Sequence, residues 1–306
     1  MRVIFAGSPE PAVPVLRALV ESHHDVVLVV TREDRPKGRS RTPVPTPVGS
    51  VADELGIPTL KPASINAPEA LQVLRDADAG ALCVAAFGQI LKDDVLQGWP
   101  CINVHYSLLP AYRGAAPVER ALMDGAERMG TTIMQMDAGL DTGPVVEAVE
   151  IAVDADDDAG AVLMKMAQAS GPALVRALDA LEAGTFTSTP QPDEGMSIAA
   201  KITDADRPID PSRTAREVVG QVRALSPHIG AVLHVDGQPF KVWRVRDTGA
   251  PVPAGLSAEG GRLVLGTATE GVEIIELQPP GKGRMQADAF LRGYRGELAL
   301  TSPAQG

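Results

Sequence analysis

The chain has 306 residues and a formal net charge of −11, with 44% hydrophobic and 22% charged residues. This length exceeds what one hydrophobic core usually organises, so we expect two domains. The acidic balance excludes a protein that binds nucleic acid over its whole surface. Aromatic residues, at 3%, are too scarce to favour a site built on base stacking.

Apolar runs and cysteines favour a cytoplasmic protein that does not enter a membrane. No window approaches the roughly 18 consecutive apolar residues of a spanning helix. The run that begins at Val3 ends at Gly7, which is too short for the hydrophobic region of a signal peptide. Cys83 and Cys101 lie in apolar runs, so we expect both thiols to be reduced and buried.

Charge is distributed unevenly along the chain. Residues 204–306 hold 12 basic and 12 acidic side chains, so the first 203 residues carry the entire net charge of −11. Within that acidic half, residues 31–41 hold five basic and two acidic side chains. The surrounding connection, 31–48, is long, aperiodic and rich in Pro, Arg and Gly. A loop of this length in a compact domain is usually functional or disordered.

The N-terminal half predicts an α/β domain with a mostly parallel sheet. A strand at 2–6 is followed by a turn in which Ser8 suits the N-cap of a helix, and 25–31 is an apolar run typical of a buried parallel strand. Gly7 alone lacks the further glycines of a dinucleotide-binding motif, which argues against NAD. We expect the remaining strands at 81–86, 101–104, 131–136 and 145–153, and helices near 48–55, 67–77, 115–125 and 158–182.

The C-terminal part predicts a small β-barrel. Regular periodicity disappears near 183–203, which we interpret as a linker, and a helix is expected at 213–225. Short extended runs separated by Gly and Pro follow at 231–235, 240–246, 262–266 and 272–278.

The candidate active site lies at the end of the strand that begins at Cys101. Asn103 and His105 are two residues apart, so their side chains leave the same face of a strand. An amide and an imidazole at a strand end suit a developing oxyanion, and a second polar stretch at 136–144, which contains Asp137 and Asp141, supplies a carboxylate. The alternative is that Asn103 and His105 cap the following loop and that Asp141 caps its own turn.

Other catalytic patterns are weak. The five histidines do not stand at metal-ligand spacing beside Cys or acidic residues, so we predict no metal site. A nucleophile elbow and a phosphate-binding loop are both missing from the sequence. Ser107 near His105 suggests a Ser–His pair, but sequence proximity does not make a catalytic dyad.

The two polar stretches resemble the folate-dependent formyltransferases. The motifs of that family, Asn-x-His, Ser-Leu-Leu-Pro, Arg-Gly-Ala-Ala-Pro and Leu-Asp-Thr-Gly-Pro, stand here at 103–105, 107–110, 113–117 and 140–144. The segments that resemble the branch of this family acting on methionyl-tRNA are 3–16, 34–39, 86–91, 241–243 and 277–283.

The resemblance implies a reaction and a set of site residues. It implies transfer of a formyl group from 10-formyltetrahydrofolate to the α-amino group of methionyl-initiator-tRNA, with Asn103, His105 and Asp141 catalytic and no metal. It implies a Rossmann-like formyltransferase domain at 1–184, a linker at 185–203 and an OB-like tRNA-binding domain at 204–306. The residues expected to bind folate are Phe87, Gly88, Gln89, Ile90, Leu91, Ser107, Leu108, Leu109, Pro110 and Asp137.

The family also implies where the RNA binds. The loop at 31–48 is expected to reach the acceptor end, with Arg39 as the main contact. The other basic residues expected to contact tRNA are Lys37, Arg41, Lys241, Arg244 and Lys282. We expect a monomer. The alternatives are a relative that formylates another amine such as a nucleotide sugar, one that hydrolyses formyl-folate, and a non-catalytic RNA-binding protein.

Overall fold

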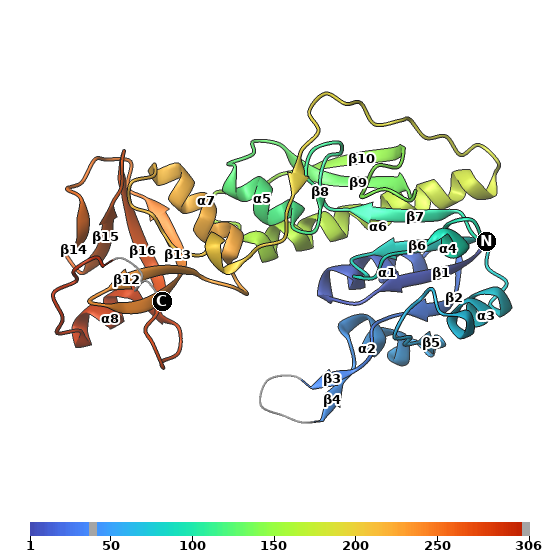
Figure 1. Cartoon of the computed structure of the whole chain (residues 1–306), viewed down its shortest axis with the longest axis horizontal. Coiled ribbons are helices and arrows are strands. Elements are labelled where there is room, and N and C mark those ends of the chain that lie inside the picture. The colour runs from blue at the N-terminus through green and yellow to red at the C-terminus, as the bar shows by residue number, and fades with distance from the viewer. Residues whose placement is uncertain (37–41, 302–306) are drawn as a thin grey trace. The chain divides into compact units, whose positions relative to one another are not determined.

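The computed structural model describes residues 1–36 and 42–301, which form two compact units (Figure 1). Unit 1 comprises Met1–Gly114, Arg128–Ala152 and Leu163–Ile198. Unit 2 comprises Ala115–Glu127, Val153–Val162 and the chain from Ala199 onward. The expected domain boundaries at 184 and 204 remain a prediction. In the described part of the chain, no helix is long and apolar enough to cross a membrane.

Unit 1 is built on a seven-stranded sheet, and its order is β10-β9-β7-β6-β1-β2-β5. The four pairs from β7 to β5 are parallel, whereas β9 pairs antiparallel with both β7 and β10. The mostly parallel sheet is therefore confirmed. Its strands are β1 (Arg2–Gly7), β2 (Asp25–Val30), β5 (Thr59–Leu60), β6 (Ala81–Ala85), β7 (Cys101–His105), β9 (Met129–Gln135) and β10 (Val145–Ile151).

Helices α1 (Val13–Val20), α2 (Pro47–Glu54), α3 (Pro68–Asp76) and α4 (Asp93–Leu96) alternate with the strands of unit 1, and α6 (Ala159–Glu182) follows β10. A short 3₁₀ turn, Glu10–Ala12, precedes α1. Two small hairpin strands, β3 (Arg35–Pro36) and β4 (Pro43–Val44), pair across the basic loop. The strand β8 (Arg113–Gly114) pairs with β11 (Ile198–Ala199).

The parallel register explains where a site can form in unit 1. Gly7 is level with Ala85, and Ala85 is level with Val104, so β1, β6 and β7 end at the same edge of the sheet. The five residues of β6 are all buried, which explains their continuous apolar sequence. A side chain at Gly7 would crowd Phe5, Ala12 and the Ala85 carbonyl. The carboxyl edge of a parallel sheet is where open α/β folds bind ligands.

Unit 2 is a curled antiparallel sheet with the strand path β12-β13-β16-β15-β14, and β17 pairs with β16. The β12 residues alternate between buried and half-buried, so one face covers the core. Helix α7 packs its buried face there, together with Phe240 and Phe290, whose rings meet edge to face. The elements are α5 (Pro117–Met123), a 3₁₀ turn (Asp204–Asp206), α7 (Ala215–Leu225), β12 (Ala231–Val235), β13 (Gln238–Asp247), β14 (Gly255–Glu259), β15 (Arg262–Gly266), β16 (Gly271–Gln278), β17 (Met285–Gln286) and α8 (Ala287–Gly293).

The core of unit 1 gives a stability prediction. Leu82 lies on β6 and is fully buried. We expect Leu82→Ala to lower the unfolding free energy of unit 1 by about 2–5 kcal/mol, because it removes buried methyl groups and leaves a cavity. Urea unfolding followed by Trp99 fluorescence measures this effect, in a background in which Trp243 of unit 2 is replaced by Phe. The matched variant Leu55→Ala, at a position with 41% exposure, should change stability little.

An ion pair inside unit 2 gives a pH prediction. The Arg120 guanidinium donates from Nη1 and Nη2 to Asp206 at 2.6 and 3.1 Å. This bonding, more than the other contacts of the carboxylate, lowers the pKa of Asp206 from 3.8 to about 2. Because the folded-state pKa is lowered, the stabilisation is complete above pH 4 and is lost as the pH falls toward 2.

The difference in unfolding free energy between the native chain and Asp206→Asn should therefore shrink across that window. Urea unfolding of unit 2, followed by Trp243 fluorescence in a Trp99→Phe background, measures it at each pH. Parallel pH dependences for the two chains would contradict the assignment.

Candidate active site

The His105 ring is held between a carbonyl and a carboxylate. His105 is the last residue of β7 and is buried, with 6% exposure. Its Nε2 donates to the Tyr112 carbonyl oxygen at 2.9 Å, and its Nδ1 lies 3.6 Å from Oδ2 of Asp141. A carbonyl only accepts, so the proton of neutral His105 sits on Nε2 and Nδ1 is left as a base. A proton added at Nδ1 would face the Asp141 carboxylate.

Asp141 lies in the loop between β9 and β10. Its backbone φ is +53°, a left-handed conformation that aspartate tolerates better than most residues. The Gly114 amide donates to Oδ2 at 2.8 Å, which fixes the carboxylate that faces His105. At the start of the same loop, Oδ1 of Asp137 accepts hydrogen bonds from the Gly139 amide and the Thr142 hydroxyl. Asp137, expected to bind folate, thus also shapes the loop of Asp141.

Asn103 shares the strand face of His105. It lies two residues before His105 on β7 and is half-buried. Within residues 1–36 and 42–301, its side-chain amide makes no hydrogen bond, so both amide protons are available to a ligand oxygen. The structure thus brings two of the three expected catalytic residues into contact and leaves the third with unused donors beside them.

The loop after β7 uses its own polar groups. The Ser107 hydroxyl donates to the Ala111 carbonyl at 2.6 Å, and the Thr132 hydroxyl donates to the Ser107 carbonyl at 2.7 Å. The Leu109 amide in turn donates to the Thr132 hydroxyl at 3.0 Å. The Ser107 hydroxyl is therefore directed to the loop rather than to His105, which argues against a Ser–His pair.

The stretch expected as a linker supplies residues that the sequence did not identify. Gln191 bonds Arg113 and the carbonyls of Asp141 and Gly143. The Ser197 hydroxyl accepts the Tyr112 amide proton at 2.9 Å. These contacts join segments far apart in the sequence, and no periodicity or motif in 185–198 signals them.

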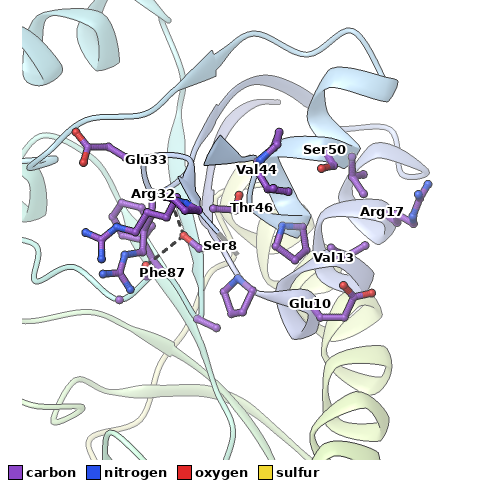
Figure 2. A pocket seen from close by; sticks show the side chains of 18 residues that line it. Ser8, Glu10, Val13, Arg17, Arg32, Glu33, Val44, Thr46, Ser50 and Phe87 are labelled. Carbon is purple, nitrogen blue, oxygen red and sulfur yellow. Dashed lines mark hydrogen bonds between the residues drawn. The ribbon is translucent and has the colours of Figure 1, made fainter. Parts of the chain in front are cut away.

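A cavity of about 850 Å³ opens near the ends of β1, β2 and β6. The Ser8 hydroxyl donates to the Phe87 carbonyl and accepts from the Arg32 amide at its wall, as Figure 2 shows. Three arginines and two glutamates line it, so it suits a ligand with anionic and apolar parts. The charged lining residues are Arg17, Arg32, Arg35, Glu10 and Glu33.

The expected folate residues occupy different environments. Phe87 and Gly88 line this cavity, whereas Leu91 packs in the core of unit 1. The Gln89 side chain bonds the Ile65 amide and the Pro62 carbonyl. Ile90 is 83% exposed, which is unusual for a large apolar residue. The folate-binding role of this set remains a prediction.

Some of the residues expected to contact RNA lie outside the described residues, and the others lie in unit 2. Lys37, Arg39 and Arg41 lie outside the described residues. Lys241 and Arg284 of unit 2 lie over the Trp243 ring, at 5.3 and 3.4 Å from its centroid. The side chains of Arg244 and Lys282 are exposed.

One group of side chains has the composition of a metal site. His23, His24 and Glu182 have ligand atoms within 4.8 Å of one another. The α-ammonium of Met1 lies 2.7 Å from Glu182 and 3.2 Å from Nδ1 of His24, so a cation already contacts these groups. The expectation of no metal remains a prediction.

Two family models match separate parts of the chain. The formyl transferase family model matches residues 1–178, and the model of the formyl transferase C-terminal domain matches residues 201–295. Two similar relatives are the methionyl-tRNA formyltransferases of Acidothermus cellulolyticus and Rhodococcus erythropolis. The first is 39% identical over 96% of this chain and 98% of its own length. The second is 41% identical over 96% of this chain and 97% of its own length.

Solved structures share the fold. The N-formyltransferase from Helicobacter canadensis, in complex with folinic acid and dTDP-3-aminofucose, has a TM-score of 0.66 and 14% identity over 90% of this chain and 98% of its own. HypX from Aquifex aeolicus, in complex with tetrahydrofolic acid, has a TM-score of 0.67 and 15% identity over 99% of this chain and 51% of its own. The fold, both family models and the full-length relatives agree, and the chain belongs to the methionyl-tRNA formyltransferases of the formyl transferase family.

Proposed function

We propose that the protein transfers the formyl group of 10-formyltetrahydrofolate to the α-amino group of methionyl-initiator-tRNA. The observation that carries this proposal is the His105 ring, held between the Tyr112 carbonyl and Asp141 beside the unused amide of Asn103. The names of the full-length relatives support the RNA substrate. Folates bound to structural neighbours support the formyl donor.

The reaction sets three demands on the site. The α-amino nitrogen attacks the formyl carbon and must lose a proton. The carbonyl oxygen becomes an oxyanion, which preorganised donors stabilise. When the intermediate collapses, the bond between the formyl carbon and N10 of the folate breaks, and N10 takes up a proton.

The residues can divide these tasks by their chemistry. Asn103 donates an amide proton to the oxyanion. Nδ1 of His105 is the ring nitrogen free to accept a proton, because the Nε2 proton is used on Tyr112. Asp141 stabilises the resulting imidazolium from 3.6 Å and holds its orientation. The cavity beside Phe87 and Arg32 suits the apolar and anionic parts of a large substrate.

A second candidate is formylation of another amine, because one structural neighbour is an N-formyltransferase in complex with dTDP-3-aminofucose. The identity of 39% and 41% to methionyl-tRNA formyltransferases over 96% of this chain, against 14% to that neighbour, favours a tRNA substrate instead. Formyl transfer measured with charged initiator tRNA and with an amino-sugar nucleotide, each with and without 10-formyltetrahydrofolate, separates the two. Hydrolysis of the donor without an acceptor would indicate a formyl-folate hydrolase. Tight RNA binding without turnover would indicate a non-catalytic protein.

The cytoplasmic location and the monomeric state remain predictions.

The proposed roles predict the effect of removing each catalytic group. Asn103→Ala, His105→Ala and Asp141→Asn should each lower kcat by about 10²–10³, because each removes a preorganised polar group. Folate binding should survive in all three. Single-turnover transfer and equilibrium folate titration measure the two quantities. Asp78→Asn is a matched control, because Asp78 is exposed and also has a positive φ, +49°. Near-normal turnover in the three variants would refute the site.

The role proposed for the basic loop predicts that a substitution in it changes RNA recognition and leaves folate binding unchanged. Arg39→Ala should raise the KM for tRNA, leave the KM for folate unchanged, and reduce the salt slope of tRNA binding by about one. This expectation rests on the composition of residues 31–41 and on the family, because Arg39 is not among the described residues. Arg75→Ala, at an exposed position at the end of α3, is the control. An unchanged KM for tRNA would remove Arg39 from the interface.

A further inference from the structure

We propose that Gln191 is a positioning residue that holds the Asp141 loop in place beside the His105 ring. This inference rests on the function proposed above. Gln191 lies in the aperiodic segment after α6 and is half-buried. Its carboxamide makes four hydrogen bonds, all to the two loops that flank the His105–Asp141 pair.

The four bonds use the full capacity of the carboxamide. Nε2 donates to the Asp141 carbonyl at 2.8 Å and to the Gly143 carbonyl at 2.7 Å. Oε1 accepts from Nε and Nη2 of Arg113 at 2.9 and 2.7 Å. Carbonyls only accept and a guanidinium only donates, so the partners determine the orientation of the amide. The side chain thus ties the loop after β7 to the loop after β9.

The Asp141 loop leaves its backbone carbonyls in need of a partner. Asp141 adopts a left-handed conformation, so its carbonyl cannot continue a strand ladder. A side chain at Gly143 would overlap the Gln135 carbonyl, so the loop has little space in which to shift. Asp137 anchors the start of the loop. Gln191 anchors its second half, at Asp141 itself and two residues later.

The segment that carries Gln191 is itself fixed on both sides. Thr189 and Val145 exchange two backbone hydrogen bonds of 2.8 Å. Further on, Ser197 accepts the Tyr112 amide proton with its hydroxyl and the Arg113 amide proton with its carbonyl, both at 2.9 Å. Tyr112 is the residue whose carbonyl holds Nε2 of His105. The segment therefore supports both sides of the imidazole.

The consequence concerns proton transfer at His105. Electrostatic interaction between Nδ1 and the Asp141 carboxylate depends on their separation, which is 3.6 Å. Releasing the Asp141 and Gly143 carbonyls frees the second half of the loop, and the Gly114 amide is then the one donor to the carboxylate among residues 1–36 and 42–301. The orientation of Asp141, and with it the protonation of His105 during turnover, should depend on Gln191.

The test compares Gln191→Glu and Gln191→Met with the native enzyme in formyl transfer to methionyl-tRNA. The Glu side chain can keep the two hydrogen bonds from Arg113, but it places a carboxylate oxygen, which cannot donate, against the Asp141 and Gly143 carbonyls. The Met side chain is similar in length to Gln and removes all four hydrogen bonds. We expect kcat to fall about 10- to 100-fold in both variants, in line with a small misplacement of a catalytic group. The KM for folate and the thermal midpoint should remain near native. The matched control is Gln97→Glu, at an exposed position.

Two readouts separate positioning from a structural role. The pH profile of kcat should shift in the same direction as that of Asp141→Asn. In an Asp141→Asn background, Gln191→Met should lower kcat little further, because both changes act through one carboxylate. Native pH profiles, additive effects, or equal losses of kcat and folate affinity would overturn the proposal. If the native enzyme itself does not formylate methionyl-tRNA, the proposed function fails instead.

Discussion

The arrangement of the active site depends on the shared edge at which β1, β6 and β7 end. Parallel pairing places Ala85 level with Val104, so the polar residues that follow each strand meet at one edge of the sheet. His105 is buried there, yet both ring nitrogens face polar groups. A buried imidazole without such partners would be costly. The carbonyl of Tyr112 and the carboxylate of Asp141 therefore both permit its burial and define which nitrogen exchanges protons.

Polar contacts tie together the loops around this edge. Asp141 bonds the Gly114 amide, and Gln191 bonds the carbonyls of Asp141 and Gly143. Hydrogen-bond networks of this kind suit a site that must keep charged groups in fixed positions while it remains open to substrate. Leu140, next to Asp141, is 60% exposed, so the loop presents an apolar surface beside the carboxylate.

Unit 2 has a different physical character. Its antiparallel sheet covers one face with helix α7 and aromatic residues, and basic residues lie over Trp243. A cation above an aromatic face keeps its charge while it is held in place. Residues 204–306, which make up most of this unit, have a net charge of zero, so any attraction to phosphates must come from the local grouping of Lys241 and Arg284 rather than from the average charge of the segment.

The sequence by itself determined the elements whose signal is local. Apolar runs predicted the buried strands of the parallel sheet, and turn residues and amphipathic spacing predicted α2, α3, α6 and α7 to within about two residues. Asn103 and His105 could be paired from their spacing on one strand, whereas the link to Asp141 came from family resemblance. Short edge strands such as β5 and β17 were missed, because two residues carry no period.

The tertiary structure decided what depends on distant contacts. The polar segment around Gln191 has no periodicity, so the sequence indicated only a linker, yet its carboxamide bonds residues 78 and 50 positions away. The partner of each His105 nitrogen likewise depends on the path of two loops in space. Hydrogen bonds between such segments arise from the fold as a whole, which is why neither spacing nor composition could indicate them.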